Sequence, residues 1–552
     1  MRQTARRERR KSERRSHRGS RPQRPFGSPD GSNTNLQDLI DNFIEMEALG
    51  SRDSPGSSAF GHSTRLLVGK MGVGKTVYLR RFQAAASDDD ALYADDVRRD
   101  IPSTADVVRV CQLLLSHEVD EVWVRIWRRA TCRAAISHLL RSPDLRERPE
   151  VRQLEAQVAD YAKLVPEFRT RRSVYSQVQN IIDRHASRAQ LRAYLFHDGW
   201  ADVETLLSDA LHHAPPVCFY LDSVDDQFSR APMFWLKCQR GLFAHAMGLL
   251  EDSDLRRVHV IACLRDVVLS EVLRGTHAGR YRNAPHIRVL DWDYGSIRHF
   301  LHEKIRRLDD VYLMAPRAND PIRAWFGRTD VMNERRGVRE QLEHYILRHT
   351  RLIPRDVVTV GNLLCDVIAS AKEAGLAAVP DREIRRVVGA AAKGFAEQQL
   401  TVCADQIAAD MIPEHGATLG YDSFYTGSSQ YADGVSGYGD ALVEALIASI
   451  AAGRRDRLGG AALATLEAKF AERFPKYDHV LDVLWQNGLL GYRSDECREP
   501  EEVHFFAAAT VDDFKLPRKQ RGYALHPCVT HKVPLATEGP PVRGFCVDSD
   551  NG

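Results

Sequence analysis

The chain has 552 residues, a length that predicts roughly three or four domains. Hydrophobic residues make up 43% of the sequence, enough for sizeable cores, and the formal net charge of +2 gives no overall basic character that would indicate nucleic-acid binding. No stretch approaches the ~18 uninterrupted apolar residues of a membrane helix, so we expect no membrane-spanning segment. The ten cysteines include no C-x-x-C pair, which indicates a reducing, cytoplasmic compartment and no cysteine-based zinc site.

Residues 1–34 are dense in arginine, with glycine, serine and proline between the arginines. Such a segment buries too little apolar surface to fold, so we predict a disordered tail. The alternative is that this basic tail contacts DNA or an acidic membrane surface. The tail has no apolar core region and is not a secretory signal. A short helix is predicted over 35–49 from its apolar spacing, and a loop over 51–63.

Residues 65–76 combine a short apolar run with a glycine-rich loop and the start of a helix. Gly69 to Thr76 matches G-x-x-x-x-G-K-[ST] at every fixed position and so resembles a Walker A phosphate-binding loop. Glycines allow backbone N–H groups to approach phosphate oxygens, and the helix dipole favours the same anion. We predict that Lys75 reaches the β- and γ-phosphates of ATP and that Thr76 ligates Mg²⁺. The predicted ATP-binding residues of this loop are Gly69, Gly72, Val73, Gly74, Lys75, Thr76 and Val77.

A long charged region follows the loop. Residues 107–115 predict a helix, and residues 121–127 predict either a second strand or the start of a helix that runs toward Leu140. The distance along the chain from Thr76 to the next acidic strand end exceeds that of a minimal phosphate-loop domain. We therefore predict a helical insertion at about 130–212.

Residues 217–222 form a continuous apolar run that ends in Asp222, as a strand buried on both faces does. Ligands bind at the carboxyl ends of strands in open α/β sheets, so we predict that Asp222 holds Mg²⁺, usually through water. Residues 258–264 repeat the pattern and end in Arg265-Asp266, and residues 287–290 predict a fourth buried strand. No other metal is expected, because no histidine has metal-ligand spacing with cysteine or glutamate.

The last part of the chain predicts mostly helices. A helical lid over 311–412 includes helices at 339–347, 357–371 and 383–412, and a linker rich in Gly, Tyr, Ser and Asp covers 413–439. Helices at 441–452, 461–474 and 477–485 precede strands at 488–493, 504–510 and 522–526. This order resembles a winged helix over 440–535, with a flexible tail over 536–552.

These elements together resemble the additional-strand group of P-loop ATPases. The sequence Asp-Ser-Val-Asp-Asp at 222–226 looks like the D-G-[apolar]-D-E pattern of STAND ATPases, particularly the NACHT-like ones. The resemblance covers roughly residues 36–365. It implies an α/β P-loop NTPase core over 35–310, built as a parallel sheet with helices on both faces, followed by the lid and the winged-helix-like α+β domain.

The resemblance also implies roles for two arginines. Arg265 falls at the sensor 1 position, where it would sense the γ-phosphate; the alternative is a salt bridge to Asp266 or another carboxylate at a strand end. Arg355, after Pro354, resembles a sensor 2 arginine of the lid; the alternative is a surface arginine at a helix start.

The pattern departs from the family at Ser223, where AAA+ hydrolases usually carry a catalytic glutamate. Asp225 or Asp226 would then orient the attacking water, and we expect slow turnover.

The resemblance implies an intracellular ATP-binding and hydrolysing switch in signalling or defence, acting as a homo-oligomer or with a partner protein. The first alternative is a DNA-binding ATPase similar to origin-recognition initiators, which the basic tail and the winged helix favour. The acidic stretch at 495–502 opposes it, because carboxylates repel phosphate. The second alternative is a nucleotide-binding scaffold without turnover.

Overall fold

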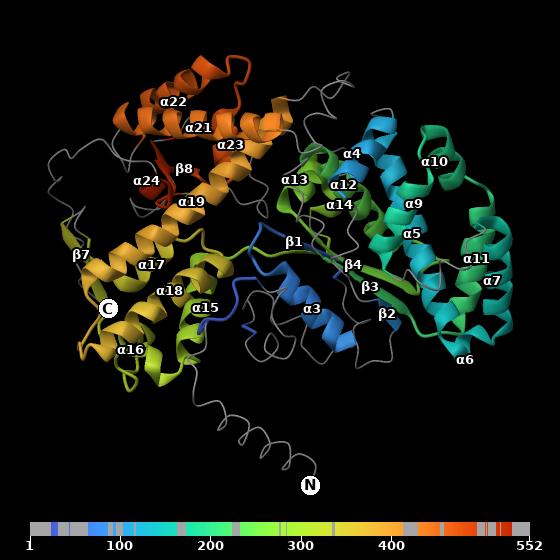
Figure 1. Ribbon diagram of the computed structural model, residues 1–552, viewed down its shortest axis with the longest axis horizontal. Coiled ribbons are helices and arrows are strands. Elements are labelled where there is room, and N and C mark those ends of the chain that lie inside the picture. Colours follow the sequence, from blue (N-terminus) through green and yellow to red (C-terminus); the bar gives the residue numbers. More distant parts are fainter. Residues whose placement is uncertain are drawn as a thin grey trace, which may run out of the picture.

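A five-stranded parallel sheet lies at the centre of the protein, with strand order β2-β3-β4-β1-β5 (Figure 1). Strand β4 therefore separates β1 from β3, and Val68 pairs with Leu264 at the carboxyl ends of β1 and β4. The strands are β1 (Leu66–Val68), β2 (Leu92–Ala94), β3 (Val217–Leu221), β4 (Val258–Leu264) and β5 (Ile287–Val289). The computed structural model describes residues 24–30, 43–44, 64–86, 92–94, 103–114, 118–162, 173–222, 232–274, 278–282, 284–333, 337–411, 429–452, 458–493, 503, 505, 515–518, 520 and 522–532.

Four of these strands confirm the predictions from apolar runs, and of the two alternatives for residues 121–127 the structure confirms the helix. Residues 121–127 lie in helix α5 (Val119–Arg141), and β2 instead follows the helix of the glycine-rich loop. The pattern at 121–127 left both alternatives open because α5 is buried on most of its circumference, which removes the one-sided apolar stripe of a surface helix. Strand β2 has three residues, too few for a recognisable pattern.

Two hydrophobic cores cover the two faces of the sheet. Side chains alternate between the faces of a strand, so Cys218 and Tyr220 of β3 belong to one core and Val217, Phe219 and Leu221 to the other. The first core, which we call the lid core, continues into helix α3 (Lys75–Ala86), the lid and the C-terminal helices. The second, the insertion core, holds the inserted helices together with α12 (Pro232–Gly248), α13 (Asp266–Arg274) and the neighbouring α14 (Ala278–Tyr281).

The insertion between β2 and β3 is a bundle of helices at one end of the molecule (Figure 1, blue to teal). The insertion begins with helix α4 at Thr104, whereas we predicted that it begins at about residue 130. Serine side chains accept hydrogen bonds from backbone N–H groups at the starts of α4, α9 and α10, as N-caps do. The helices are α4 (Thr104–Leu113), α5, α6 (Pro143–Arg146), α7 (Pro149–Ala162), α9 (Val174–Arg184), α10 (Arg188–Leu195) and α11 (Gly199–His212).

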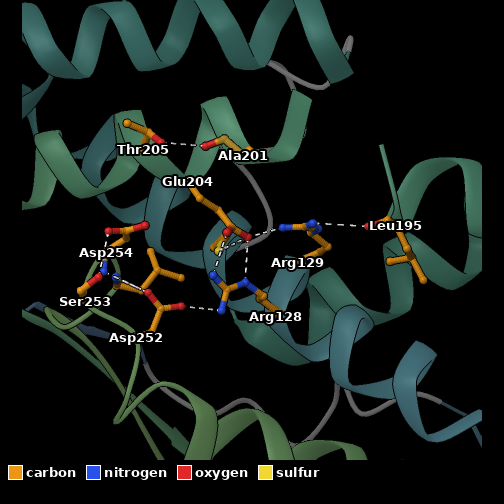
Figure 2. A network of polar contacts seen from close by, with 11 residues as sticks. Arg128, Arg129, Leu195, Ala201, Glu204, Thr205, Asp252, Ser253 and Asp254 are labelled. Carbon is orange, nitrogen blue, oxygen red and sulfur yellow. Dashed lines mark hydrogen bonds and ion pairs between the residues drawn. The ribbon is translucent and has the colours of Figure 1, made fainter. Parts of the chain in front are cut away.

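A network of charged side chains joins the insertion to the sheet domain (Figure 2). Arg128 of α5 donates to both carboxylate oxygens of Glu204 of α11, at 2.9 and 2.7 Å. Arg128 also pairs with Asp252, in the loop between α12 and β4, at 2.6 Å, and Arg129 shares Glu204. Despite the opposing effect of burial, hydrogen bonds to the two carboxylates raise the pKa of Arg128 above its ordinary value.

The lid lies on the other side of the sheet and contains a hairpin as well as helices (Figure 1). Residues 339–341 belong to strand β7 rather than to the helix predicted over 339–347, which begins only at Leu342. The elements are α15 (Tyr294–Arg306), the 3₁₀ helix η5 (Asp310–Tyr312), α16 (Pro321–Phe326), β6 (Asp330–Asn333), β7 (Val338–Gln341), α17 (Leu342–Arg348), α18 (Pro354–Glu373) and α19 (Asp381–Met411).

The C-terminal region packs on α19 and has helices followed by an antiparallel strand pair. Helix α21 begins at Ser429, inside the predicted 413–439 linker, and the ring of its Tyr438 lies 4.5 Å from that of Phe474. Of the predicted strand at 504–510, the structure describes only residue 505. Among the described helices, none is both long enough and apolar enough to cross a membrane. The elements are α21 (Ser429–Ala452), α22 (Gly460–Arg473), α23 (Val480–Gln486), β8 (Leu490–Arg493), β9 (Gly522–Leu525) and α24 (Val529–Lys532).

Residues 24–30 are docked on the lid, so the prediction of a disordered tail up to residue 34 is wrong for this segment. Phe26 is 1% exposed, and its ring lies 5.1 Å from that of Trp325. Its backbone N–H donates to Asn362 Oδ1 at 2.9 Å, and Asn362 Nδ2 donates to the Gly27 carbonyl at 3.0 Å. A Cβ on Gly361 would lie 2.3 Å from Phe26 Cδ1, so α18 needs glycine there. The arginine-rich composition of residues 1–34 did not indicate that the aromatic side chain of Phe26 would be buried.

Candidate functional site

The glycine-rich loop connects β1 to the first turn of α3. Gly72 and Gly74 have φ angles of +90° and +101°, which side chains with a Cβ rarely adopt. A Cβ on Gly69 would lie 2.9 Å from the Leu290 carbonyl oxygen, so the loop passes close to the end of β5. The N-terminus of α3 faces this loop because the helix begins at Lys75. The loop therefore brings backbone and a helix N-terminus together, as anion binding requires.

Lys75 is 7% exposed and its ammonium group points back into the loop. Nζ donates to the carbonyl oxygens of Gly69 at 2.8 Å and Lys70 at 3.1 Å. Thr76 and Val77 follow in the first turn of α3, where the Gly74 carbonyl accepts the Val77 N–H at 2.9 Å. An incoming phosphate would have to replace the carbonyl oxygens as the partner of Lys75.

The carboxyl ends of β3 and β4 bring Asp222 and Arg265 to the same edge of the sheet as the loop. Asp222 is 8% exposed, and its backbone carbonyl accepts a hydrogen bond from the Tyr175 hydroxyl at 2.5 Å. Arg265 follows β4 directly, and its Nη2 lies 3.9 Å from Met71 Sδ of the loop. The predicted water-orienting residues Asp225 and Asp226 lie outside the described residues.

Arg355 contacts the loop from the lid side. Its backbone N–H donates to the Gly72 carbonyl at 3.2 Å, and a Cβ on Gly72 would lie 3.0 Å from Arg355 Cβ. Its Nε donates to the Pro29 carbonyl of the docked N-terminal segment at 3.3 Å. The start of α18 thus connects the loop to residues 24–30, and the sensor 2 role of Arg355 stays a prediction.

The sequence did not predict two further neighbours of the loop, of which the first is hydrogen-bonded to it. Trp292 Nε1 donates to the Val73 carbonyl at 3.0 Å and so holds the middle of the loop. A Cβ on Gly488, in the turn between α23 and β8, would lie 3.8 Å from Lys70 Nζ. Trp292 could have been found, because it follows a predicted strand at the edge already assigned to Asp222. Gly488 could not, because no local pattern places a distant turn on the loop.

His526 adds an electrostatic link between the C-terminal region and this loop. Burial, together with the nearby Arg351 and Lys70 cations, lowers the pKa of His526 to about 3. The ring is therefore neutral at pH 7. Its Nδ1 accepts the Cys528 N–H at 3.2 Å, so the ring proton resides on Nε2. A neutral histidine can lie near two cations without direct charge repulsion.

The described residues contain no group of three or more His, Cys, Asp and Glu side chains that could hold a metal ion. Mg²⁺ commonly uses fewer protein ligands, because water and phosphate oxygens complete its octahedron. The hydroxyl of Thr76 and the carboxylate of Asp222 are oxygen donors of the kind that Mg²⁺ prefers. Comparisons with protein-family models, with curated proteins and with solved structures found no match.

Proposed function

We propose that this chain is an ATP-binding and hydrolysing switch of the STAND or AAA+-related kind. The observation that carries the proposal is the strand order. A glycine-rich loop follows β1, an aspartate follows β3, and β4 lies between these strands and ends in Arg265. An inserted strand between the two motif-bearing strands is the arrangement that the resemblance to additional-strand P-loop ATPases implies.

In this proposal the loop binds the phosphates and Lys75 contacts their β- and γ-oxygens. Thr76 and Asp222 would hold Mg²⁺, which would neutralise negative charge that develops during the reaction. Arg265 senses the γ-phosphate from the end of β4. Asp225 or Asp226 orients the water, and the short carboxylate makes turnover slow.

The lid and the C-terminal region support a switch because both contact the loop. The Arg355 N–H donates to the Gly72 carbonyl, and a Cβ on Gly488 would lie 3.8 Å from Lys70 Nζ, so the Gly488 turn is near the loop. Phosphate binding must redirect Lys75 away from the loop carbonyls, which changes the backbone that these two regions contact. Nucleotide state and domain arrangement are then coupled, as in other nucleotide-driven switches.

The C-terminal region has the element order of a winged helix, including a bridge between Leu458 and Tyr523 that adds a third strand position. Its α23 would be the DNA-reading helix. All six residues from Val480 to Trp485 are buried, so this helix offers no free face to a DNA groove. This burial favours the switch over the initiator-like alternative.

The proposal is tested by measuring nucleotide binding and turnover in the full chain. Lys75→Ala should abolish ATP binding while the protein stays folded, because the ammonium group that meets the phosphates is gone. Lys469→Ala, a surface lysine paired with Glu472, is the matched control and should bind like the parent. Unchanged ATP affinity in folded Lys75→Ala would overturn the site.

The same assay separates the alternatives. Binding of ATP and of GTP is compared to show which nucleobase the site prefers. Turnover is also measured with duplex DNA at several salt concentrations. Turnover that depends on sequence-specific DNA would favour the initiator-like function. ATP binding without any turnover would favour the scaffold.

A further inference from the structure

The indole of Trp292 fixes the direction of one peptide unit in the glycine-rich loop. Trp292 follows β5 and is buried, and its Nε1 donates to the Val73 carbonyl at 3.0 Å. In a planar trans peptide the C=O and the following N–H point in opposite directions, so the Gly74 N–H points away from the indole. The Gly74 carbonyl accepts the Val77 and Tyr78 N–H groups at 2.9 and 3.1 Å. The Gly74 N–H therefore lies at the N-terminus of α3, where an anion binds.

The preceding peptide unit is held from outside the loop in the same way. The Arg355 N–H donates to the Gly72 carbonyl at 3.2 Å, so the Val73 N–H points away from the start of α18. The sign of φ alternates along Gly72, Val73 and Gly74, as it does in the concave backbone nests that bind anions. Neither the Val73 nor the Gly74 N–H donates to a backbone carbonyl of the described residues. Both groups can therefore serve a phosphate.

Trp292 is itself held on both sides along the chain. Before it, the Leu290 N–H donates to the Val68 carbonyl at 2.8 Å, which keeps the end of β5 beside the strand that leads into the loop. After it, Asp293 caps α15 by accepting the Ser296 N–H at 2.7 Å. The indole packs edge-on against Phe300 of α15, with 5.5 Å between ring centroids. The indole N–H is therefore already in place before any ligand binds.

We propose that Trp292 is a positioning residue for phosphate binding: by holding the Val73 carbonyl, it keeps the Gly74 N–H directed at the phosphates. The inference rests on the proposed function, to which it adds a residue far from the glycine-rich motif in the sequence. Trp292 acts through the loop and does not touch the nucleotide. A backbone N–H that binds phosphate equally in the ground state and the transition state changes affinity and leaves the chemical step unchanged.

The test removes the indole N–H with Trp292→Phe in the full chain, which keeps an aromatic ring beside Phe300. We expect the Kd for Mg-ATP to rise roughly fivefold, the effect of losing one hydrogen bond, while kcat at saturating ATP stays parental. The Kd for inorganic tripolyphosphate, which has neither base nor sugar, should rise by the same factor. Trp200→Phe is the matched control, because Trp200 Nε1 also donates to a backbone carbonyl, that of Tyr194, at 3.0 Å, but lies in the inserted bundle. It should keep the parental Kd values.

Hydrogen–deuterium exchange without nucleotide gives a readout that does not depend on activity. Trp292→Phe should speed exchange in peptides that cover 70–78, whereas Trp200→Phe should leave it unchanged. If Trp292→Phe does not fold, Phe300→Leu, which keeps the indole and removes the ring that orients it, should also raise the Kd for tripolyphosphate.

Three outcomes would overturn the role of Trp292: parental Kd values in Trp292→Phe, equal losses of affinity in both tryptophan variants, or a loss for ATP without a loss for tripolyphosphate. A parent that binds neither ATP nor tripolyphosphate would overturn the proposed function instead, and the exchange result would still report the contact between Trp292 and the loop.

Discussion

Two junctions between elements, one in each core, are held by different polar groups. In the insertion core, Arg128 and Arg129 share Glu204, and Arg128 also binds Asp252, so the contacts between elements are ionic (Figure 2). In the lid core, amide side chains join α19 to the turn after α23. Gln406 donates to Gln486 at 2.8 Å, Asn487 donates to Gln406 at 2.8 Å, and Gln399 donates to Asn487 at 3.1 Å.

This difference determines which contacts can be undone. Separating buried ions leaves charge without a partner, which costs several kcal/mol. Separating neutral amides exchanges one hydrogen bond for another with water and costs about 1 kcal/mol each. The ionic junction of the insertion should therefore be more costly to separate than the amide contacts of the turn after α23.

The largest expected effect is on the ionic side. Glu204→Ala leaves both arginines without their shared carboxylate and should lower the free energy of unfolding by about 3 kcal/mol. Urea unfolding measures the loss. Glu121→Ala, which removes an exposed partner of Arg125, is the control and should change stability little. Equal losses of unfolding free energy in Glu204→Ala and Glu121→Ala would show that the ion pairs of Glu204 stabilise the fold no more than an exposed pair does.

A smaller loss is expected where the N-terminal segment docks on the lid. Phe26→Ala removes a fully buried ring and should lower the free energy of unfolding by about 2 kcal/mol. Deleting residues 1–32 should have a similar effect, because the same anchor is lost. Unchanged thermal stability after the deletion would show that the segment is not docked in solution.

Acid should weaken both cores through buried histidines, among them His245 and His526. Burial lowers the pKa of His245 in the insertion core and of His526 in the lid core to about 3 each. In the unfolded chain each ring takes up a proton near pH 6.5 and the folded one does not, so stability is present above pH 6.5 and is lost as the pH falls toward 3.

The expected loss is about 1 kcal/mol for each histidine between pH 6.5 and 5.5. Unfolding in urea at several pH values measures it. His245→Gln and His526→Gln should each remove about 1 kcal/mol of this loss, so the free energy of unfolding should depend less on pH in each variant. A parental pH dependence in both variants would contradict the assignment.

The smallest expected effect is on the amide contacts. Gln406→Ala should cost about 1 kcal/mol or less, yet raise the rate at which a water-soluble acylating reagent modifies Lys70, because the turn after α23 detaches more often. Gln179→Ala, which removes amide contacts to Asp106 and Asp183 in the insertion, is the matched control. It should leave the labelling of Lys70 unchanged.

Local chemistry was enough to predict the buried strands and the loop. Strands β1, β3, β4 and β5 are apolar runs because a parallel sheet is covered on both faces, and the loop needs glycine where φ is positive. The position of β4 between β1 and β3 could not be predicted from the residues alone, since the sequence of a buried strand does not specify which strand it pairs with.

Contacts between distant segments were also beyond the sequence. No motif in the sequence pairs the two residues of such a contact. Examples are Tyr175 with Asp222, Gly488 with Lys70, and Phe26 with α18. Arg355 lies in the first turn of α18, and its sensor role stays a prediction from the resemblance. Asp225 and Asp226 stay predictions.

The close packing of Phe26 on Gly361 has a consequence for how this protein can vary over evolution. Glycine inside a helix such as α18 is unfavourable by about 1 kcal/mol relative to alanine, so random drift would replace Gly361 if nothing opposed it. Any side chain there would collide with the ring of Phe26. In relatives of this chain, positions 26 and 361 should therefore change as a pair: an aromatic residue with glycine, or a larger residue at 361 with the aromatic lost.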